Sequence, residues 1–319
     1  MKYISSLIIP FVVLAAGNLS AQVPGDAAVQ AQWFTGTLEA PSPAFPKAGL
    51  VGIEPYVIYQ RNTGEYGTSG AHQEVPHDLR QVNSETLIKY GITDRLSVQT
   101  VAAFAHVWND QNSFTGVEDL PLEFDYRFND ENNKTGLPSI TASMGISFPI
   151  GNYQGLQSSI AGLGSGAFTL KEGLLAQSLF DTPGHHPVRL RLYGAGYEPM
   201  ADVSLHDASV YGSQGGFVGH AAPGFAGILG IGGGYCLTRR WVLAFDFVQN
   251  LAHGSLLVGT VGGASVNSQA AGSDQSSIAP AVEYNFSGHV GLIAGEELSV
   301  AGRNSSSYFA PQIALSIAY

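Results

Sequence analysis

His253-Gly254-Ser255 is the one motif in this chain whose residue types and spacing point to catalysis. On a β-strand, residues two apart project from the same face, so the imidazole and the hydroxyl could meet as a base and its nucleophile. Asn267 is the candidate third residue that would orient the histidine. The surrounding residues are mostly Gly, Ala and Ser, as in loops, so we treat this pair as the less favoured interpretation.

Two further motifs lack the partners that their chemistry needs. Gly162-Leu163-Gly164-Ser165-Gly166 resembles a phosphate-binding loop, but no Lys-Ser/Thr follows it and no helix is predicted after it. His185-His186 has no acidic or cysteine partner at a metal-ligand spacing, and adjacent strand residues point to opposite faces. We therefore expect no cofactor, no metal and no enzymatic activity.

Charged residues recur in this sequence with a period of two. Between Asp119 and Phe128, apolar residues occupy one face of an extended segment, and charged residues with Pro121 occupy the other. This alternation is typical of a β-strand, whereas a helix would mix both kinds around its circumference. The same pattern predicts a charged surface formed by ten residues: Glu85, Lys89, Asp119, Glu123, Asp125, Arg127, Arg189, Arg191, Asp246 and Glu283.

The first 21 residues have the features of a secretory signal peptide. Lys2 precedes an apolar run from residue 4 to residue 16, and Leu19-Ser20-Ala21 forms a small-residue cleavage site. The run is too short to span a bilayer as a helical anchor. We therefore predict that residues 1–21 are removed during export.

The composition excludes several classes of protein. Only 12% of the 319 residues are charged and 40 are glycine, which is unusual for a soluble enzyme. The formal charge of −11, or −12 without Lys2, argues against nucleic acid as a partner. Cys236 is the only cysteine, so no internal disulfide forms. No stretch after the signal has 18 consecutive apolar residues, so a membrane-spanning form must be a closed β-barrel.

Alternating segments predict an all-β chain, a transmembrane antiparallel β-barrel of about 12 strands. The first and last strands are 51–59 and 309–319, and the expected hairpins pair 82–90 with 96–108, 119–128 with 139–150, 168–180 with 188–197, 225–237 with 241–247, and 278–286 with 290–300. The turns within these hairpins lie at one end. Longer connections lie at the other end: 61–80, 109–116, 151–166, 200–222 and 251–275.

The barrel is expected to cover residues 48–319, preceded by residues 22–47 as an extended periplasmic N-terminal arm that could fold into the barrel mouth. Short turns are periplasmic and long loops extracellular in outer-membrane barrels. The register of 168–180 and 290–300 stays open, because adjacent charged residues put a charge on both faces of each segment.

The apolar face is predicted to meet lipid. Aromatic residues collect beside the short turns on the apolar faces, as in the interfacial girdle of a membrane barrel: Tyr90, Phe128, Tyr235, Trp241, Phe286 and Tyr319. The chain ends on Tyr319 after alternating residues, which resembles the C-terminal signal read by the barrel-assembly machinery. Outer-membrane lipid and this machinery are the predicted partners, in the outer membrane of a Gram-negative-type bacterium.

Several segments resemble the outer-membrane barrels named for the meta-pathway of phenol degradation. These are Val82 to Arg95, Gly116 to Phe128, Gly145 to Gly151 and Gly162 to Gly166. The resemblance covers roughly residues 80–250, and this chain has Glu118 where the family usually has glycine. It implies an outer-membrane transporter or porin with aromatic or other hydrophobic cargo.

Three functions follow as hypotheses. The favoured one is a passive channel or transporter for small, aromatic or hydrophobic molecules, with the ten charged residues along its path. The second is a structural or surface-interaction barrel with a sealed lumen. The third is a lipid hydrolase using His253 and Ser255, since some outer-membrane lipases use a similar His-x-Ser pair.

Overall fold

The computed structural model describes residues 32–43, 45–74, 79–132, 136–182, 184 and 186–318. The predicted signal peptide, the first ten residues of the predicted arm and Tyr319 lie outside the described residues. Within the described part, no helix is long and apolar enough to cross a membrane.

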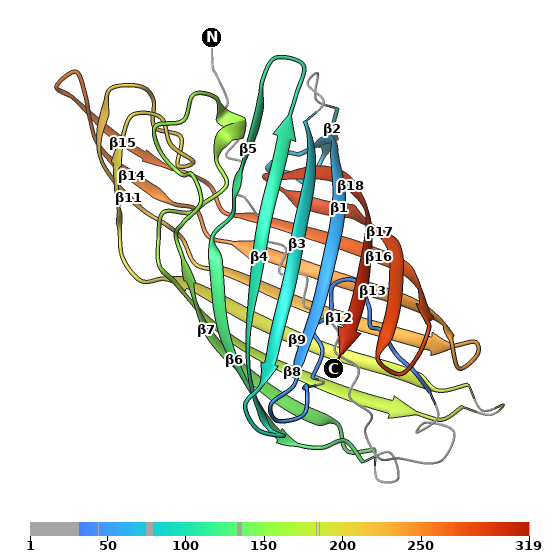
Figure 1. Cartoon of the computed structure of the whole chain (residues 1–319). Helices are drawn as coiled ribbons and strands as arrows, with labels where there is room; N and C mark the ends of the chain where they lie inside the picture. The colour runs from blue at the N-terminus through green and yellow to red at the C-terminus, as the bar shows by residue number, and fades with distance from the viewer. Residues whose placement is uncertain are drawn as a thin grey trace.

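The main body is a closed antiparallel β-barrel (Figure 1). Its sheet has 14 strands, and all but the short β2 (His72–Gln73) and β5 (Ser113–Val117) form the ring, which leaves 12. In spatial order the ring contains β1 (Val51–Tyr66), β3 (Arg80–Gly91), β4 (Leu96–Trp108), β6 (Leu120–Asn129), β7 (Ser139–Phe148), β8 (Thr169–Phe180), β9 (Val188–Pro199), β12 (Ala226–Cys236), β13 (Trp241–Ala252), β16 (Ser273–Asn285), β17 (Val290–Arg303) and β18 (Ser305–Ala318). The predicted fold class is therefore confirmed.

The first and last strands close the ring. β1 pairs with β18 from Gly52 opposite Ala318 to Tyr66 opposite Ser305, with one bulge after Asn62. This closure leaves no open edge in the wall, which is the condition for strands to cross a bilayer. β1 is longer than the predicted 51–59, because polar residues beyond Tyr59 continue to pair on both sides.

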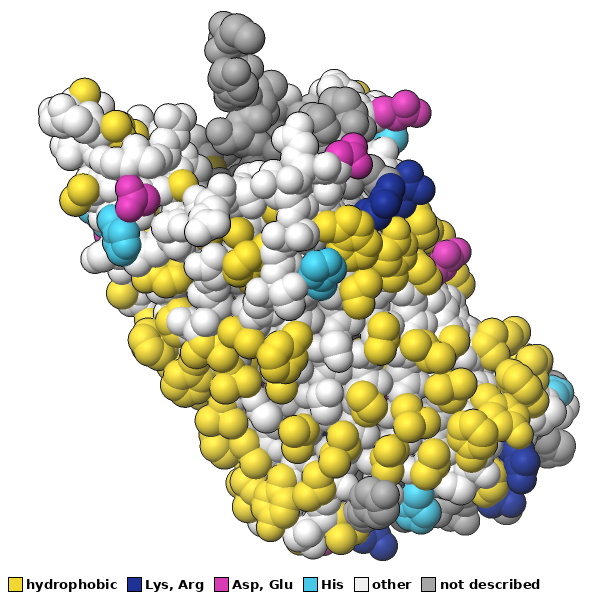
Figure 2. Space-filling model, turned by 45° about the horizontal axis from the view of Figure 1, so that its top comes forward, with side chains coloured by type: hydrophobic (Ala, Val, Ile, Leu, Met, Phe, Trp, Pro, Cys, Tyr) yellow, Lys and Arg dark blue, Asp and Glu magenta, His cyan; other side chains and the backbone are white. Residues whose placement is uncertain are grey.

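The side chains are distributed inside out. Phe124 and Leu192 are 48% and 61% exposed on the outer wall, whereas their neighbours Glu123 and Arg191 are 2% and 3% exposed. Figure 2 shows hydrophobic side chains over the barrel wall below the loops. The predicted aromatic residues are also exposed at the short-turn end: Tyr90, Phe128, Tyr235, Trp241 and Phe286.

The two segments of open register each place one charge outward. In β8, Lys171 points inward and Glu172 is exposed, and in β17, Glu297 is buried and Glu296 is exposed. The bulge between β16 and β17 lies at Ser276, beyond the glutamates, so it does not remove either outward carboxylate.

A second sheet stands above the barrel at the long-loop end (Figure 1). Its strand order is β10 (Val203–His206), β11 (Phe217–Ala222), β14 (Leu256–Val261) and β15 (Ala264–Gln269). The expectation that 200–222 and 251–275 are plain loops is therefore wrong. These two connections pair with each other through β11 and β14 and bury an apolar cluster that includes Phe217 and Leu257.

Candidate functional site

The ten charged residues singled out from the sequence lie on the inner wall or at its rim. Nine belong to β3, β6, β9, β13 and β16, and Asp119 directly precedes β6. All are buried except Arg127, which is partly exposed. Since alternate strand residues share a face, this inner placement follows from the alternation in the sequence.

Ion pairs cross the inner wall between strands. Lys89 Nζ lies 2.8 Å from Asp125 Oδ2, and Arg189 Nη2 lies 2.7 Å from Glu283 Oε1. Lys171 Nζ lies 2.6 Å from Glu123 Oε1. Each pair joins strands two or three places apart in the ring, so charge-assisted hydrogen bonds link non-adjacent strands on the inner wall.

Residues 32–43 and 45–47, called the plug from here on, lie inside the barrel. Gln32 Nε2 donates to the carbonyls of Thr238 and Arg239 in a short turn, both at 3.1 Å. The chain then reaches the middle of the lumen, where Leu38 is fully buried in a cluster of wall residues. It returns to the same end, where Gly49 N–H donates to the Gly91 carbonyl at 2.8 Å.

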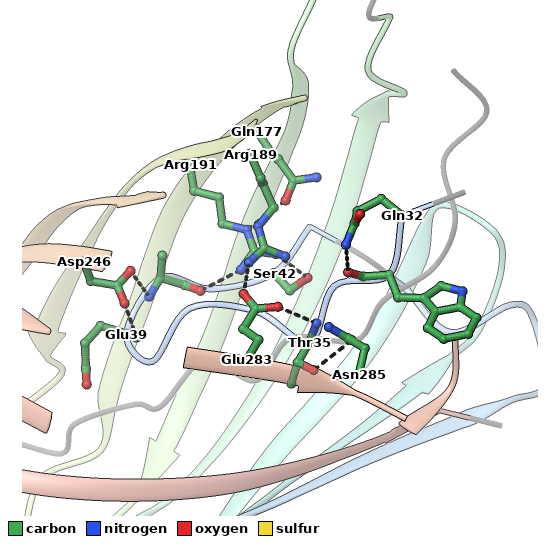
Figure 3. Close-up of polar contacts among 12 residues, drawn as sticks. Gln32, Thr35, Glu39, Ser42, Gln177, Arg189, Arg191, Asp246, Glu283 and Asn285 are labelled. Carbon is green, nitrogen blue, oxygen red and sulfur yellow. Dashed lines mark hydrogen bonds and ion pairs between the residues drawn. The ribbon is translucent and has the colours of Figure 1, made fainter. Parts of the chain in front are cut away.

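The plug therefore enters and leaves at the short-turn end, and Figure 3 shows it crossing the lumen between the strands. The described residues of the predicted arm, 32–43 and 45–47, therefore lie at the lumen of the barrel. The boundary at residue 48 stays a prediction.

Backbone groups of the plug bind the lumenal carboxylates (Figure 3). Thr35 N–H donates to Glu283 Oε2 at 2.8 Å. The N–H groups of Glu39 and Ala40 donate to the two oxygens of Asp246 at 3.1 and 3.2 Å. Two lumenal carboxylates thus accept hydrogen bonds from the backbone of the plug.

Arg191 is a lumenal base that donates hydrogen bonds to the plug. Its Nη1 donates to the Ala40 carbonyl at 3.1 Å, and its Nη2 donates to Ser42 Oγ at 3.3 Å. Its Nε donates to Gln177 Oε1 on the neighbouring strand at 2.8 Å. Arg191 thereby links the plug to the wall.

Aromatic side chains of the plug lie against lumenal cations. Arg189 lies 4.5 Å from the ring centroid of Phe34, and Lys89 lies 4.7 Å from that of Phe45. A cation over an aromatic face contributes about 0.5–2 kcal/mol. The same bases that pair with wall carboxylates therefore also hold the plug.

Wall glycines make room for the plug. A Cβ at Gly232 would lie 2.6 Å from the Ala40 Cβ, and one at Gly291 would lie 1.8 Å from Thr35 Oγ1. Real Cβ atoms do not approach so closely, so side chains at these positions would displace the plug.

A cavity of about 50 Å³ remains beside the plug. Its lining includes Glu39, Glu123, Lys171, Tyr193 and Tyr197. A cavity that holds a single aromatic ring needs about 150 Å³. This cavity is therefore too small for an aromatic ring.

This is the fold of a solved outer-membrane channel. An outer membrane channel from Pseudomonas putida F1 superposes with a TM-score of 0.64 at 15% identity, over 87% of this chain and 97% of that one. The transport unit of the autotransporter AIDA-I from Escherichia coli gives 0.53 at 11% identity, over 85% and 90%. Neither a protein-family model nor a curated protein matches the sequence.

Asp119 has a different environment from the other nine residues. One of its oxygens accepts from Gly151 N–H at 2.9 Å, and the other accepts from the N–H and hydroxyl of Ser165 at 2.8 and 2.7 Å. It thus ties the loop between β7 and β8 to the barrel rim. Next to it, burial and the Asp119 charge raise the pKa of Glu118 to about 7.

Several lumenal residues were missed from the sequence. Lys171, Glu54 and Glu297 face inward with the predicted ten, and Glu39 reaches the lumen from the plug. The signal for Lys171 and Glu297 was present, because each stands beside a second charge and one of the two must face inward. Glu54 lies two residues before Tyr56 on β1, so the alternation of strand residues places both on the inner face. The Tyr56 hydroxyl donates to Glu54 at 2.8 Å.

The hydrolase hypothesis required His253 and Ser255 to lie on one strand and share a face, and the structure does not show this. Residues 253–255 form the connection between β13 and β14 rather than a strand, so the expected shared face is wrong. His253 is exposed and packs on Phe225, whereas Ser255 is buried and its carbonyl accepts from Ala270 N–H. Asn267 lies on β15, opposite Val258.

Proposed function

We propose that this chain is an outer-membrane channel for small molecules, closed at rest by the plug, and that it is not an enzyme. The observation that carries the proposal is the plug itself, which lies across a charged lumen and binds its carboxylates and bases, with a cavity of about 50 Å³ beside it. Its displacement would open a path past Glu123, Arg189 and Asp246. Export through the predicted signal peptide and insertion through the C-terminal strand belong to the same proposal.

We propose small neutral aromatic compounds as the cargo, in line with the resemblance to the phenol meta-pathway barrels. Carboxylates outnumber bases on the inner wall, and an acidic lumen disfavours anions. Phenol should therefore enter protein-containing liposomes faster than benzoate, which has a similar size and a negative charge.

A reversible lock tests whether the plug must move. The Cβ of Thr35 lies 3.0 Å from an ideal Cβ at Gly291, about 0.5 Å closer than the shortest Cβ–Cβ distance of a disulfide, so the plug must shift by that amount for the bond to form. The variant T35C/G291C, made with Cys236→Ala, should pass ions and phenol when reduced and neither when oxidised. Planar-bilayer conductance and liposome uptake measure this, and the reduced form is the matched control.

A sealed structural barrel is the second candidate, because ion pairs and the plug fill the lumen. It predicts no conductance from the wild type, from the reduced cysteine variant or from a chain lacking residues 32–47. That result from folded protein would defeat the channel proposal. Equal conduction by the reduced and oxidised forms would show instead that passage does not need the plug to move.

A further inference from the structure

The aromatic side chains of the described plug all lie against bases of the barrel. Trp33, Phe34 and Phe45 each have a Lys or Arg within 4.7 Å of the ring centroid. Contacts of this kind occur about once per 70–80 residues in proteins, so three on one short segment are unusual. The interior of this barrel is therefore suited to aromatic rings.

Phe34 lies in a place that has both apolar walls and a cation. Its ring packs with Leu179, Cys236 and Val242, which are buried and face inward from β8, β12 and β13. Arg189 of β9 adds its guanidinium, whose carbon lies 4.5 Å from the ring centroid. We call Leu179, Arg189, Cys236 and Val242 the ring site. All four belong to barrel strands, so the ring site does not leave with the plug.

Contacts within the wall position the guanidinium of the ring site. Arg189 Nη2 lies 2.7 Å from Glu283 Oε1, and Figure 3 shows the two side chains meeting beside Thr35. Arg189 is also the register partner of Gly234 on β12, where an ideal Cβ would lie 3.4 Å from the same nitrogen. These contacts do not involve Phe34, so they can hold the cation in place for another ring.

The composition of the ring site selects one class of ligand. Small-molecule sites are mostly apolar with a few polar groups that give specificity. A cation is attracted to the face of an aromatic ring, whereas a saturated ring of the same size offers it no such face. Phe34 carries a six-membered aromatic ring, so the ring of phenol matches the space that this side chain fills.

We propose that the ring site binds the aromatic ring of the cargo, and that Phe34 occupies it only while the plug is in place. The proposal rests on the proposed function, which supplies both the aromatic cargo and a plug that moves. A ligand that binds only after Phe34 has left shifts the equilibrium toward the released plug. The cargo therefore competes with the plug and favours its own passage.

Cys236 reports on the ring site, because it is the only cysteine of the chain and is 1% exposed where it packs with Phe34. In the folded full-length variant Phe34→Ala, a maleimide should label Cys236 faster than in the wild type, and phenol should slow this labelling again. Cyclohexanol has a six-membered ring and one hydroxyl but no aromatic face. It should need about fivefold higher concentration for the same protection, the equivalent of about 1 kcal/mol.

Two control variants separate the ring site from general effects of phenol. Phe245→Ala removes a phenyl ring from the lipid face of β13, so Cys236 should be labelled at the wild-type rate with and without phenol. In F34A/R189Q/E283Q the cation is removed without leaving an unpaired carboxylate. Phenol and cyclohexanol should then protect Cys236 at equal concentrations. Heat-modifiable migration on gels establishes that each variant is folded.

A second measurement keeps Phe34 and does not depend on the folding of Phe34→Ala. Thr35 is 2% exposed and follows Phe34 in the chain. In T35C/C236A, phenol should therefore speed maleimide labelling at position 35, because it takes the place of the ring and releases the plug. Cyclohexanol at the same concentration should speed it less.

The proposal is overturned if Phe34→Ala does not speed the labelling of Cys236, or if phenol fails to slow it again. Equal protection by phenol and cyclohexanol in this variant would overturn the contact with Arg189, and unchanged labelling at position 35 would overturn the competition with the plug. None of these measurements needs conduction. A barrel that binds phenol here and never conducts would defeat the channel alone, whereas conduction without any effect of phenol on labelling would defeat the ring site alone.

Discussion

The pair Arg189–Glu283 allows the attachment of the plug to be measured. Both side chains are at most 3% exposed and lie 2.7 Å apart, and Glu283 also accepts from Thr35 N–H. Removing one partner of a buried ion pair costs about 3–5 kcal/mol, because the other charge stays buried without its counter-ion. Arg189→Gln also removes the contact with Phe34, which contributes about 0.5–2 kcal/mol.

We therefore expect Arg189→Gln to lower the free energy of unfolding by at least about 3–5 kcal/mol, the cost of the broken ion pair, with the lost Phe34 contact in addition. The double variant R189Q/E283Q should lose less than the sum of the two single variants, since no unpaired charge remains. Urea unfolding in lipid vesicles, followed by tryptophan fluorescence, measures these values. Thiol labelling of Thr35→Cys in a Cys236→Ala background should be faster when Arg189 is replaced, because the plug is held less firmly.

Arg95→Gln is the matched control for this series, since Arg95 is exposed in a short turn. Its effect should stay within about 0.5 kcal/mol. Additive losses in the double variant would refute the coupling, and so would a loss below about 1 kcal/mol from Arg189→Gln, the range of a surface ion pair. Unchanged thiol labelling would show that the pair supports the wall alone.

Three further outcomes are expected. Gly232→Val should raise conductance by displacing the plug, whereas Gly233→Ala, whose Cβ would meet nothing closer than 3.6 Å, should not. Burial raises the pKa of Glu131 from 4.5 to about 7. Between these two pH values the native state therefore binds more protons at this carboxyl than the unfolded chain does. The stability contributed by that carboxyl is full below pH 4.5 and is lost as the pH rises through 7, and Glu131→Gln should remove this part of the pH dependence of unfolding. Asp119→Asn should increase protease cleavage in the loop between β7 and β8, because the charge-assisted bonds to Ser165 are weakened.

The barrel could be predicted because the alternation of apolar and charged residues is visible within each short segment of the sequence. Residues 120–128 alternate between lipid and lumen with a period of two, and a slip by one residue would place Glu123 or Arg127 in lipid. The short turns then fix which strands are neighbours. The strand count and the inner placement of the charged residues both follow from this single alternation.

The second sheet and the plug could not be read in the same way. β11 and β14 are six residues each and come from two different loops, so their pairing leaves no local signal. The plug binds the wall partly through backbone groups, such as the N–H of Glu39 and the carbonyl of Ala40. Every residue except proline carries both groups, so this part of the binding leaves no signal in the sequence.

The balance of charge in the wall explains why a backbone segment suits this lumen. Within the described strands, the inward carboxylates are Glu54, Glu85, Glu123, Asp125, Asp246, Glu283 and Glu297, and the inward bases are Lys89, Arg127, Lys171, Arg189 and Arg191. Ion pairing within the wall therefore leaves an excess of acceptors, and the N–H groups of the plug match part of that excess at Asp246 and Glu283. Without the plug the same carboxylates would face water, so an opened lumen should pass cations in preference to anions. A reversal potential of the opposite sign, measured across a salt gradient with residues 32–47 deleted, would contradict this account of how the plug is held.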